Sequence, residues 1–168
     1  MSPWQLHRLQ EHEFRMITTI KRVNLKSLDE LWKIERECFM KEAYTKQEIA
    51  TLLNGSNVFG LGAWVNGEIA GFVIGGIEDS GSGVVGHIYT IDVAAKHRGQ
   101  GVGAGLLSEI EAVFIRRNAE VSYLEVRADN RGARKLYEGQ GYREIETLED
   151  YYSSGAHGLR MRKYLRSR

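Results

Sequence analysis

The sequence predicts a single α/β domain, with a mixed, mostly antiparallel sheet of about seven strands and about four helices. Two observations predict this class. Short apolar stretches of strand length alternate along the chain with segments whose apolar residues recur at helical spacing. One long helical segment separates two strands, and such a crossover implies a parallel pair within an otherwise antiparallel sheet. We expect residues 16–168 to form this domain and residues 1–15 to be a frayed or accessory leader.

The first elements are a strand and a capped helix. Residues 16–23 are predicted to form the strand. Ser27 and Glu30 have the spacing of a capping box, in which a serine oxygen and a glutamate carboxylate satisfy free amides at a helix start. Apolar residues then recur at helical spacing as far as Phe39, where we expect this helix to end.

A shorter helix and a hairpin follow. Residues 45–48 repeat the capping-box spacing, and an Asn-Gly pair at 54–55 is typical of a helix end. A second Asn-Gly pair, at 66–67, is the dipeptide that most readily supplies the positive φ angles of a two-residue hairpin turn. We therefore expect antiparallel strands on either side of it, at 58–65 and 68–77.

The second half of the chain contains the crossover. A β-branched stretch at 87–93 predicts a buried strand, and apolar residues from Val102 to Phe114 predict a long helix after a glycine-rich turn. The other elements are expected to be a strand at 121–126, a helix at 130–139 and strands at 142–145 and 159–164.

Composition and charge disfavour several classes of protein. The 23 Lys and Arg residues nearly balance the 22 Asp and Glu residues, so no global field is available to bind nucleic acid or an acidic membrane. The single cysteine, Cys38, excludes an intramolecular disulfide framework and a zinc site built on cysteines. The sequence shows neither a signal-peptide pattern nor an apolar run of membrane length. We therefore expect a cytoplasmic protein without nucleic-acid or membrane partners.

The 19 glycines are concentrated in the middle of the chain, where several form the turn between the strand at 87–93 and the long helix. Gly99, Gly101 and Gly103 let a ligand approach the backbone closely, and the free amides of a helix start attract phosphate. A tight turn that binds nothing is the alternative. The turn matches neither a G-x-x-x-x-G-K-[ST] loop nor a G-x-G-x-x-G loop in a first βαβ unit, which disfavours nucleotide hydrolysis and dinucleotide binding.

Two motifs resemble one known family. Arg98-x-x-Gly101-x-Gly103 resembles the acyl-CoA pyrophosphate loop of the GNAT superfamily of N-acetyltransferases. A second block is similar to that of the N-terminal amino-acid branch, of the ribosomal-protein alanine and archaeal Nα types. This block comprises Leu124-Glu125-Val126-Arg127, then Asn130, Ala133, Leu136, Tyr137, Gly141 and Tyr142.

The resemblance implies that acetyl-CoA is the cosubstrate and that it binds where the strand at 87–93 splays from the strand at 121–126. The strand at 87–93 would bond the pantetheine arm through its backbone. The turn would bind the pyrophosphate with Arg98 as an anchor, and Asn130 would contact the pantetheine arm. An N-cap role for Asn130 is the alternative. The implied cofactor positions are Ile91, Asp92, Val93, Arg98, Gly99, Gln100, Gly101, Val102, Gly103, Ala104, Asn130 and Tyr137.

The resemblance also implies catalytic roles. Tyr137 would lie near the thioester sulfur and donate a proton to the leaving thiolate. Glu125 is the first candidate for the base that deprotonates the amine through a water, and among apolar neighbours we expect its pKa to be raised; an ion pair is its alternative role. Glu42 matches a loop glutamate that some N-terminal acetyltransferases employ, so both acids are candidates. His87 is expected to face Glu125 as a core histidine or proton relay, and no metal site is expected.

The acceptor is expected to be the N-terminal α-amine of a protein or peptide, with a ribosomal protein as one candidate. Tyr44, Tyr151 and Tyr152 match positions that wall the peptide entrance in related enzymes, the latter two in a loop before the last strand. Acetylation of a lysine side chain, a polyamine or another small amine is the alternative, and a non-catalytic acyl-CoA sensor is a second. An α-amine is the easier nucleophile, because its reference pKa lies about 2.5 units below that of lysine.

Overall fold

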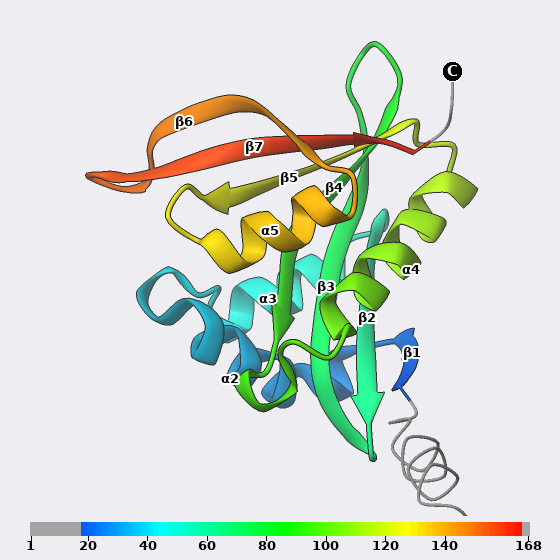
Figure 1. Ribbon diagram of the computed structural model, residues 1–168. Helices are drawn as coiled ribbons and strands as arrows, with labels where there is room; N and C mark the ends of the chain where they lie inside the picture. Colours follow the sequence, from blue (N-terminus) through cyan, green and yellow to red (C-terminus); the bar gives the residue numbers. More distant parts are fainter. Residues whose placement is uncertain (1–17, 166–168) are drawn as a thin grey trace, which may run out of the picture.

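Figure 1 shows the computed structural model, which describes residues 18–165; the predicted leader, 1–15, lies outside the described residues. These residues form one seven-stranded sheet in the order β1-β2-β3-β4-β5-β7-β6. The strands are β1 (Thr18–Arg22), β2 (Val58–Val65), β3 (Glu68–Asp79), β4 (Val84–Val93), β5 (Val121–Arg127), β6 (Arg143–Ser153) and β7 (Ala156–Tyr164). The α-helices are α2 (Leu28–Phe39), α3 (Lys46–Leu53), α4 (Val102–Arg116) and α5 (Arg131–Gly139). Short 3-10 turns are η1 (Leu25–Ser27), η2 (Met40–Glu42) and η3 (Ala95–His97).

Each face of the sheet carries its own apolar core. Helices α2 and α3 cover one face, where Leu31 and Ile49 are fully buried against β3 residues such as Phe72. Helix α4 covers the other face together with α5, and its Leu106 and Phe114 are fully buried there. The predicted fold class and order of elements are confirmed.

Local sequence signals account for most element ends. Asn66 and Gly67 have φ angles of 50° and 80°, as the predicted hairpin turn requires. At the start of α3 both halves of the predicted capping box are present: the Glu48 amide donates to Thr45 Oγ1 at 3.2 Å, and the Thr45 amide donates to Glu48 Oε2 at 2.7 Å. The second helix therefore begins where its polar residues predict.

The predicted capping box at the start of α2 is wrong. Ser27 makes no side-chain capping bond. The chain instead enters α2 through η1, where Oδ1 of Asn24 accepts a hydrogen bond from the Lys26 amide at 2.9 Å. Because this turn precedes α2, the Leu28 amide already has a partner in the Leu25 carbonyl. The capping residue therefore lies one turn earlier than the spacing predicted.

The predicted short strand at 142–145 and the loop before the last strand are also wrong. Strand β6 runs from Arg143 to Ser153, so Tyr151 and Tyr152 lie in a strand and not in a loop. Nearly all residues of β6 are exposed, and β6 lies at the edge of the sheet. An edge strand without a buried face has no alternation of apolar residues, so its pairing with β7 could not be predicted from periodicity.

Three glycines inside β3 and β4 make room for aromatic rings. A Cβ at Gly75 would lie 2.7 Å from Cζ of Phe114, and one at Gly86 would lie closer still to the same ring. A Cβ at Gly76 would lie 2.5 Å from the hydroxyl of Tyr89. These glycines thus let the α4 core and the Tyr89 side chain lie directly on the sheet.

We expect Gly86→Ala to destabilise the protein by about 1–3 kcal/mol, because the added methyl group overlaps the fully buried Phe114 ring. Gly132→Ala is the control, since nothing lies within 4 Å of a Cβ there. Chemical denaturation of both variants measures the difference. Equal stability of Gly86→Ala and the wild type would show that Phe114 can move aside.

The parallel pairing of β4 with β5 covers only the first half of β4. Its register runs from Val85 opposite Val121 to Ile88 opposite Leu124. Beyond this point β4 continues to Val93, whereas β5 pairs with β7 on its other side. The register between β3 and β4 also passes over Tyr89, a bulge that bends β4. The two strands therefore splay apart as predicted (Figure 1).

Candidate active site

Glu125 lies at the point where β4 and β5 separate. It follows Leu124, the last residue of β5 that pairs with β4, and its side chain is 11% exposed. Its Oε2 lies 2.7 Å from Nε2 of His87 on β4, and its Oε1 accepts a bond from Nε of Arg160 on β7 at 3.2 Å. The prediction that His87 faces Glu125 is confirmed, and the ion-pair role of Glu125 is present as well.

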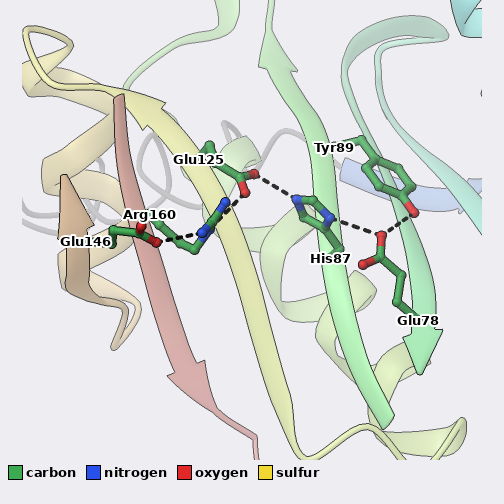
Figure 2. Close-up of polar contacts among 6 residues, drawn as sticks. All are labelled: Glu78, His87, Tyr89, Glu125, Glu146 and Arg160. Carbon is green, nitrogen blue, oxygen red and sulfur yellow. Dashed lines mark hydrogen bonds and ion pairs between the residues drawn. The ribbon is translucent and has the colours of Figure 1, made fainter. Parts of the chain in front are cut away.

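This contact belongs to a line of polar side chains that crosses β3, β4, β5, β7 and β6 (Figure 2). On one side, His87 Nδ1 lies 3.1 Å from Glu78 Oε1, which also accepts the Tyr89 hydroxyl at 2.9 Å. On the other side, Arg160 donates from Nη1 to Glu146 Oε2 at 2.6 Å. The Glu78 side chain is 46% exposed, so this line of polar side chains connects the point where β4 and β5 separate to solvent.

These contacts set the charges of Glu125 and His87. Burial raises the pKa of the Glu125 carboxyl, but the hydrogen bonds and charges of His87 and Arg160 outweigh it and hold that pKa below its ordinary value. The predicted raised pKa is therefore wrong. Burial lowers the pKa of His87, whereas Glu125 and Glu78 raise it, and the resulting pKa lies above the ordinary value.

Glu42 is held by a cation. It lies in η2 and pairs with Nη1 of Arg127 at the end of β5, while Asp129 binds the same guanidinium through two bonds of 2.9 Å. The Arg127 guanidinium also lies 5.9 Å from the centre of the Tyr152 ring. The structure thus brings the predicted residues Glu42 and Tyr152 together through Arg127, and each of the two candidate bases, Glu42 and Glu125, pairs with an arginine.

The other two tyrosines lie at the same end of the site. Tyr151 and Tyr152 make an edge contact, with ring centres 4.9 Å apart. Tyr44 lies in the α2–α3 linker, half-buried; burial raises its pKa, and the nearby Glu35 and Tyr151 groups raise it further. Phenols from two separate segments therefore lie near one another at the end of β5.

Tyr137 is buried in α5, with 6% of its surface exposed, and its ring lies edge-on to Tyr142 at 6.2 Å. Burial raises the pKa of the Tyr137 hydroxyl above its ordinary value. The phenol therefore keeps its proton at neutral pH, as a general acid must.

The glycine-rich turn has the geometry of an anion site. Gly99 and Gly101 have φ angles of 72° and 83°, a left-handed conformation that favours glycine. No side chain caps α4, so the amides of its first turn, which Val102, Gly103 and Ala104 form, point out of the helix start without helical partners. A Cβ at Gly99 or Gly101 would meet nothing within 4 Å, so the turn is open. It fits the pyrophosphate of acetyl-CoA.

Three predicted cofactor residues already have protein partners. Arg98 donates from Nε to the Val93 carbonyl at 3.0 Å and from Nη2 to Sγ of Cys38 at 3.4 Å. Oδ1 of Asn130 accepts the Ala133 amide at 3.1 Å, which confirms the N-cap role. Gln100 bonds the Lys96 carbonyl at 3.3 Å. A cofactor contact by these three residues remains a prediction.

Sequence reasoning missed Arg160 as a partner of Glu125 and Arg127 as a partner of Glu42. Arg160 lies directly opposite Glu125 in the β5–β7 register, and Arg127 follows Glu125 by two residues on the same strand. Neither arginine has a local sequence signal for its role, because the pairing of β5 with β7 and the contact between β5 and η2 join segments that are distant in the sequence. Among residues 18–165 no group of three or more His, Cys, Asp or Glu side chains is placed to bind a metal ion. Nor does any described helix have the length and apolarity needed to cross a membrane.

Known proteins resemble this chain in sequence and fold. A model of the acetyltransferase (GNAT) family matches residues 27–142. The chain is 32% identical over 145 residues to an uncharacterized N-acetyltransferase of Methanocaldococcus jannaschii, covering 86% of this chain and 90% of the relative. It is 31% identical over 145 residues to an N-alpha-acetyltransferase of Sulfurisphaera tokodaii, covering 81% of this chain and 86% of the relative.

Among solved structures, the ribosomal-protein-S18-alanine N-acetyltransferase from Escherichia coli shares the fold. Its TM-score is 0.79 with 22% identity, over 90% of this chain and 96% of that chain. The family match spans β2 to β5 with the glycine-rich turn, and the relative that is 32% identical covers 86% of this chain. The chain therefore belongs to the acetyltransferase (GNAT) family, and the protein is an acetyltransferase that uses acetyl-CoA.

Proposed function

We propose that the protein acetylates the N-terminal α-amine of a protein or peptide by direct transfer within a ternary complex. The observation that carries this proposal is the position of Glu125, at the splay and bonded to both His87 and Arg160. The relatives named N-alpha-acetyltransferase support the choice of acceptor. A ribosomal protein stays one candidate substrate.

The charge of Glu125 favours a weakly basic acceptor. Because its pKa is held low, Glu125 is a carboxylate at neutral pH. It can orient the amine or a water, but it holds a proton weakly. His87, with its raised pKa, can take the proton from that carboxylate and pass it toward Glu78 at the surface. A lysine acceptor would need about 3.5 kcal/mol more for deprotonation at neutral pH than an α-amine.

The cosubstrate would lie between the splayed strands, with its pyrophosphate on the residues from Gly99 to Ala104 and its arm along Ile91, Asp92 and Val93. When bound, acetyl-CoA supplies the activated acetyl group. Tyr137 holds a proton next to this gap, and Tyr44, Tyr151 and Tyr152 would line the approach of the acceptor. Glu42, which pairs with Arg127, is the second candidate base.

A peptide library tests the acceptor. The protein is incubated with acetyl-CoA and peptides that carry both a free N-terminus and an internal lysine, including the N-terminal sequences of ribosomal proteins. We expect mass spectrometry to place the new acetyl group on the α-amine. Label only on lysine, or transfer only to polyamines in a parallel assay, would reject the proposal in favour of the alternative acceptors.

Removal of the Tyr137 hydroxyl is expected to lower kcat by about 10²-fold or more, because the leaving thiolate loses its proton donor. In Tyr137→Phe the ring still packs against Tyr142, so the Kd of acetyl-CoA from calorimetry should change little. Tyr142→Phe is the control: its hydroxyl bonds Glu111 and Ser122 in the core, so its loss should lower stability and not kcat. Unaltered kcat in Tyr137→Phe would show that another donor acts.

A further inference from the structure

A buried pair of acids joins α2 to β4 beside the candidate active site. Glu35 is 1% exposed and Asp92 is 2% exposed. The hydroxyl of Thr90 lies between them, 3.1 Å from Glu35 Oε2 and 3.3 Å from Asp92 Oδ1. Two carboxyl groups that share one buried hydroxyl cannot both be ionised without a large electrostatic cost.

The count of hydrogens indicates which acid is neutral. A threonine hydroxyl has one hydrogen and can donate to only one of the two carboxyl groups at a time. Both oxygens of Glu35 already face donors, since Oε1 accepts the Tyr44 amide at 2.9 Å and Oε2 accepts Thr90. Among residues 18–165 the second oxygen of Asp92, Oδ2, is buried and has no hydrogen-bond partner. This pattern fits a Glu35 carboxylate and an Asp92 acid whose Oδ1 donates to Thr90.

The groups that face Asp92 agree with this assignment. Burial and the nearby Glu35 raise the pKa of Asp92 well above its ordinary value, whereas Thr90 and the positive charge of Arg98 act weakly in the opposite direction. Burial raises the pKa of the Cys38 thiol to about 11, so Cys38 is neutral. Tyr137 keeps its proton as well. Glu35 and Arg98 are thus the charged groups among these neighbours of Asp92.

We propose that Asp92 is held as a neutral acid and that Asp92, Thr90 and Glu35 form a directed hydrogen-bond chain that positions the acceptor side of the active site. The proposal rests on the proposed function for its effect on the acceptor. Glu35, at the end of the chain, holds the backbone amide of Tyr44 and hence the linker that carries Glu42 and Tyr44. This hydrogen-bond chain therefore ties the α2–α3 linker, which would line the approach of the acceptor, to β4. Acetyl-CoA would lie along the same strand.

The neutral state of Asp92 also serves the proposed acid. A negative charge at Asp92 raises the pKa of the Tyr137 hydroxyl, which makes the phenol a weaker proton donor. With a proton on Asp92 this effect is absent. Glu35, Thr90 and Asp92 are thus positioning residues, which act through Tyr44 and Tyr137 and not by touching the reacting atoms.

The first test concerns the proton and does not depend on the acceptor. Because the pKa of Asp92 is raised on folding, its contribution to stability is present at low pH and is lost as the pH rises through that pKa. The Tm of Asp92→Asn minus that of the wild type should therefore increase between pH 5 and pH 8, values that bracket neutrality. A difference that stays constant over this range would show that Asp92 is ionised throughout and would overturn the proposal.

The second test concerns positioning. We expect Thr90→Val, which removes the bridging hydroxyl, to raise the KM of the acceptor about tenfold and to affect KM more than kcat. Thr90→Ser keeps the hydroxyl and should restore KM to within about twofold of the wild type. A loss of Tm in Thr90→Val without any change in KM would indicate a structural role alone and would overturn the positioning role.

The two proposals fail in different ways. If the peptide library finds only lysine or polyamine acceptors, the proposed function is wrong, and KM is then measured with the acceptor that was found. If Thr90→Val does not fold, Thr90→Ser and a Glu35→Met variant, which is of similar size but lacks the acceptor of the Tyr44 amide, supply the KM comparison, with a raised KM expected only for Glu35→Met. Unchanged KM in Glu35→Met would then reject the positioning role.

Discussion

Replacement of Glu125 by glutamine is expected to lower kcat by about 10²- to 10⁴-fold, the usual contribution of a general base. Glutamine is nearly the same size and can still accept the bond from Arg160, so the splay of β4 and β5 should persist. It cannot carry the negative charge that orients the amine or receive its proton. Initial rates with saturating acetyl-CoA and an N-terminal peptide measure the loss.

Glu146→Gln is the matched control, because Glu146 bonds the same arginine at 2.6 Å but is 51% exposed and lies two strands away from the splay. We expect its kcat to stay within about twofold of the wild type. Glu42→Gln and the double variant with Glu125→Gln divide the base role between the two acids. Full activity in the double variant would reject both candidates.

The pH profile identifies the group that takes the proton next. Activity should fall on the acidic side as His87 becomes protonated, since an imidazolium cannot accept a proton from Glu125. Because Glu125 and Glu78 raise the pKa of His87, this limb should lie above the ordinary histidine value. In His87→Gln the limb should move to lower pH; an unmoved limb would mean that His87 is not part of the relay.

An acidic residue at Gly101 is expected to weaken acetyl-CoA binding by about 100-fold or more. Gly101 has a φ of 83°, where an L-residue costs about 1–2 kcal/mol, and a carboxylate at the start of α4 would repel the pyrophosphate. Isothermal titration calorimetry with acetyl-CoA measures Kd for Gly101→Glu. Gly101→Ala, which adds the backbone strain without the charge, separates the two causes.

Gly81→Glu is the control for this variant. Gly81 lies in the loop between β3 and β4, has a φ of 78° and has nothing within 4 Å of a Cβ, so it matches Gly101 in strain and in open space. Its Kd for acetyl-CoA should equal that of the wild type. Normal affinity in Gly101→Glu would mean that the phosphate site lies elsewhere.

Elements with a buried face could be predicted from the sequence, and the exposed edge could not. Strand β2 begins and ends where its apolar run predicts, at Val58 and Val65. Strand β6 extends well beyond the predicted residues 142–145, because its exposed, charged residues show no apolar alternation. Its hydrogen bonds to β7 stabilise it. Some of these pairs, such as Arg143 with Arg162, join residues more than ten positions apart in the sequence.

For the site, the residue types were predictable and their electrostatics were not. Glu125 and Tyr137 follow from the motif in which they lie, and the structure places Glu125 at the splay. The predicted direction of the Glu125 pKa shift was wrong, because apolar neighbours along β5 suggested desolvation alone. His87 and Arg160, which reverse that direction, come from β4 and β7, on the two sides of β5.

The glycines in the middle of the chain also separate what the sequence determined from what the tertiary structure decided. The sequence by itself determined the left-handed turns at Gly67 and Gly101, since local backbone conformation depends on the residue and its immediate neighbours. Only the tertiary structure decided why Gly75 and Gly86 lie in strands, because the Phe114 ring that needs their space comes from α4. It also decided which acid carries a charge, since burial and ion pairing depend on groups that folding brings together from distant parts of the chain.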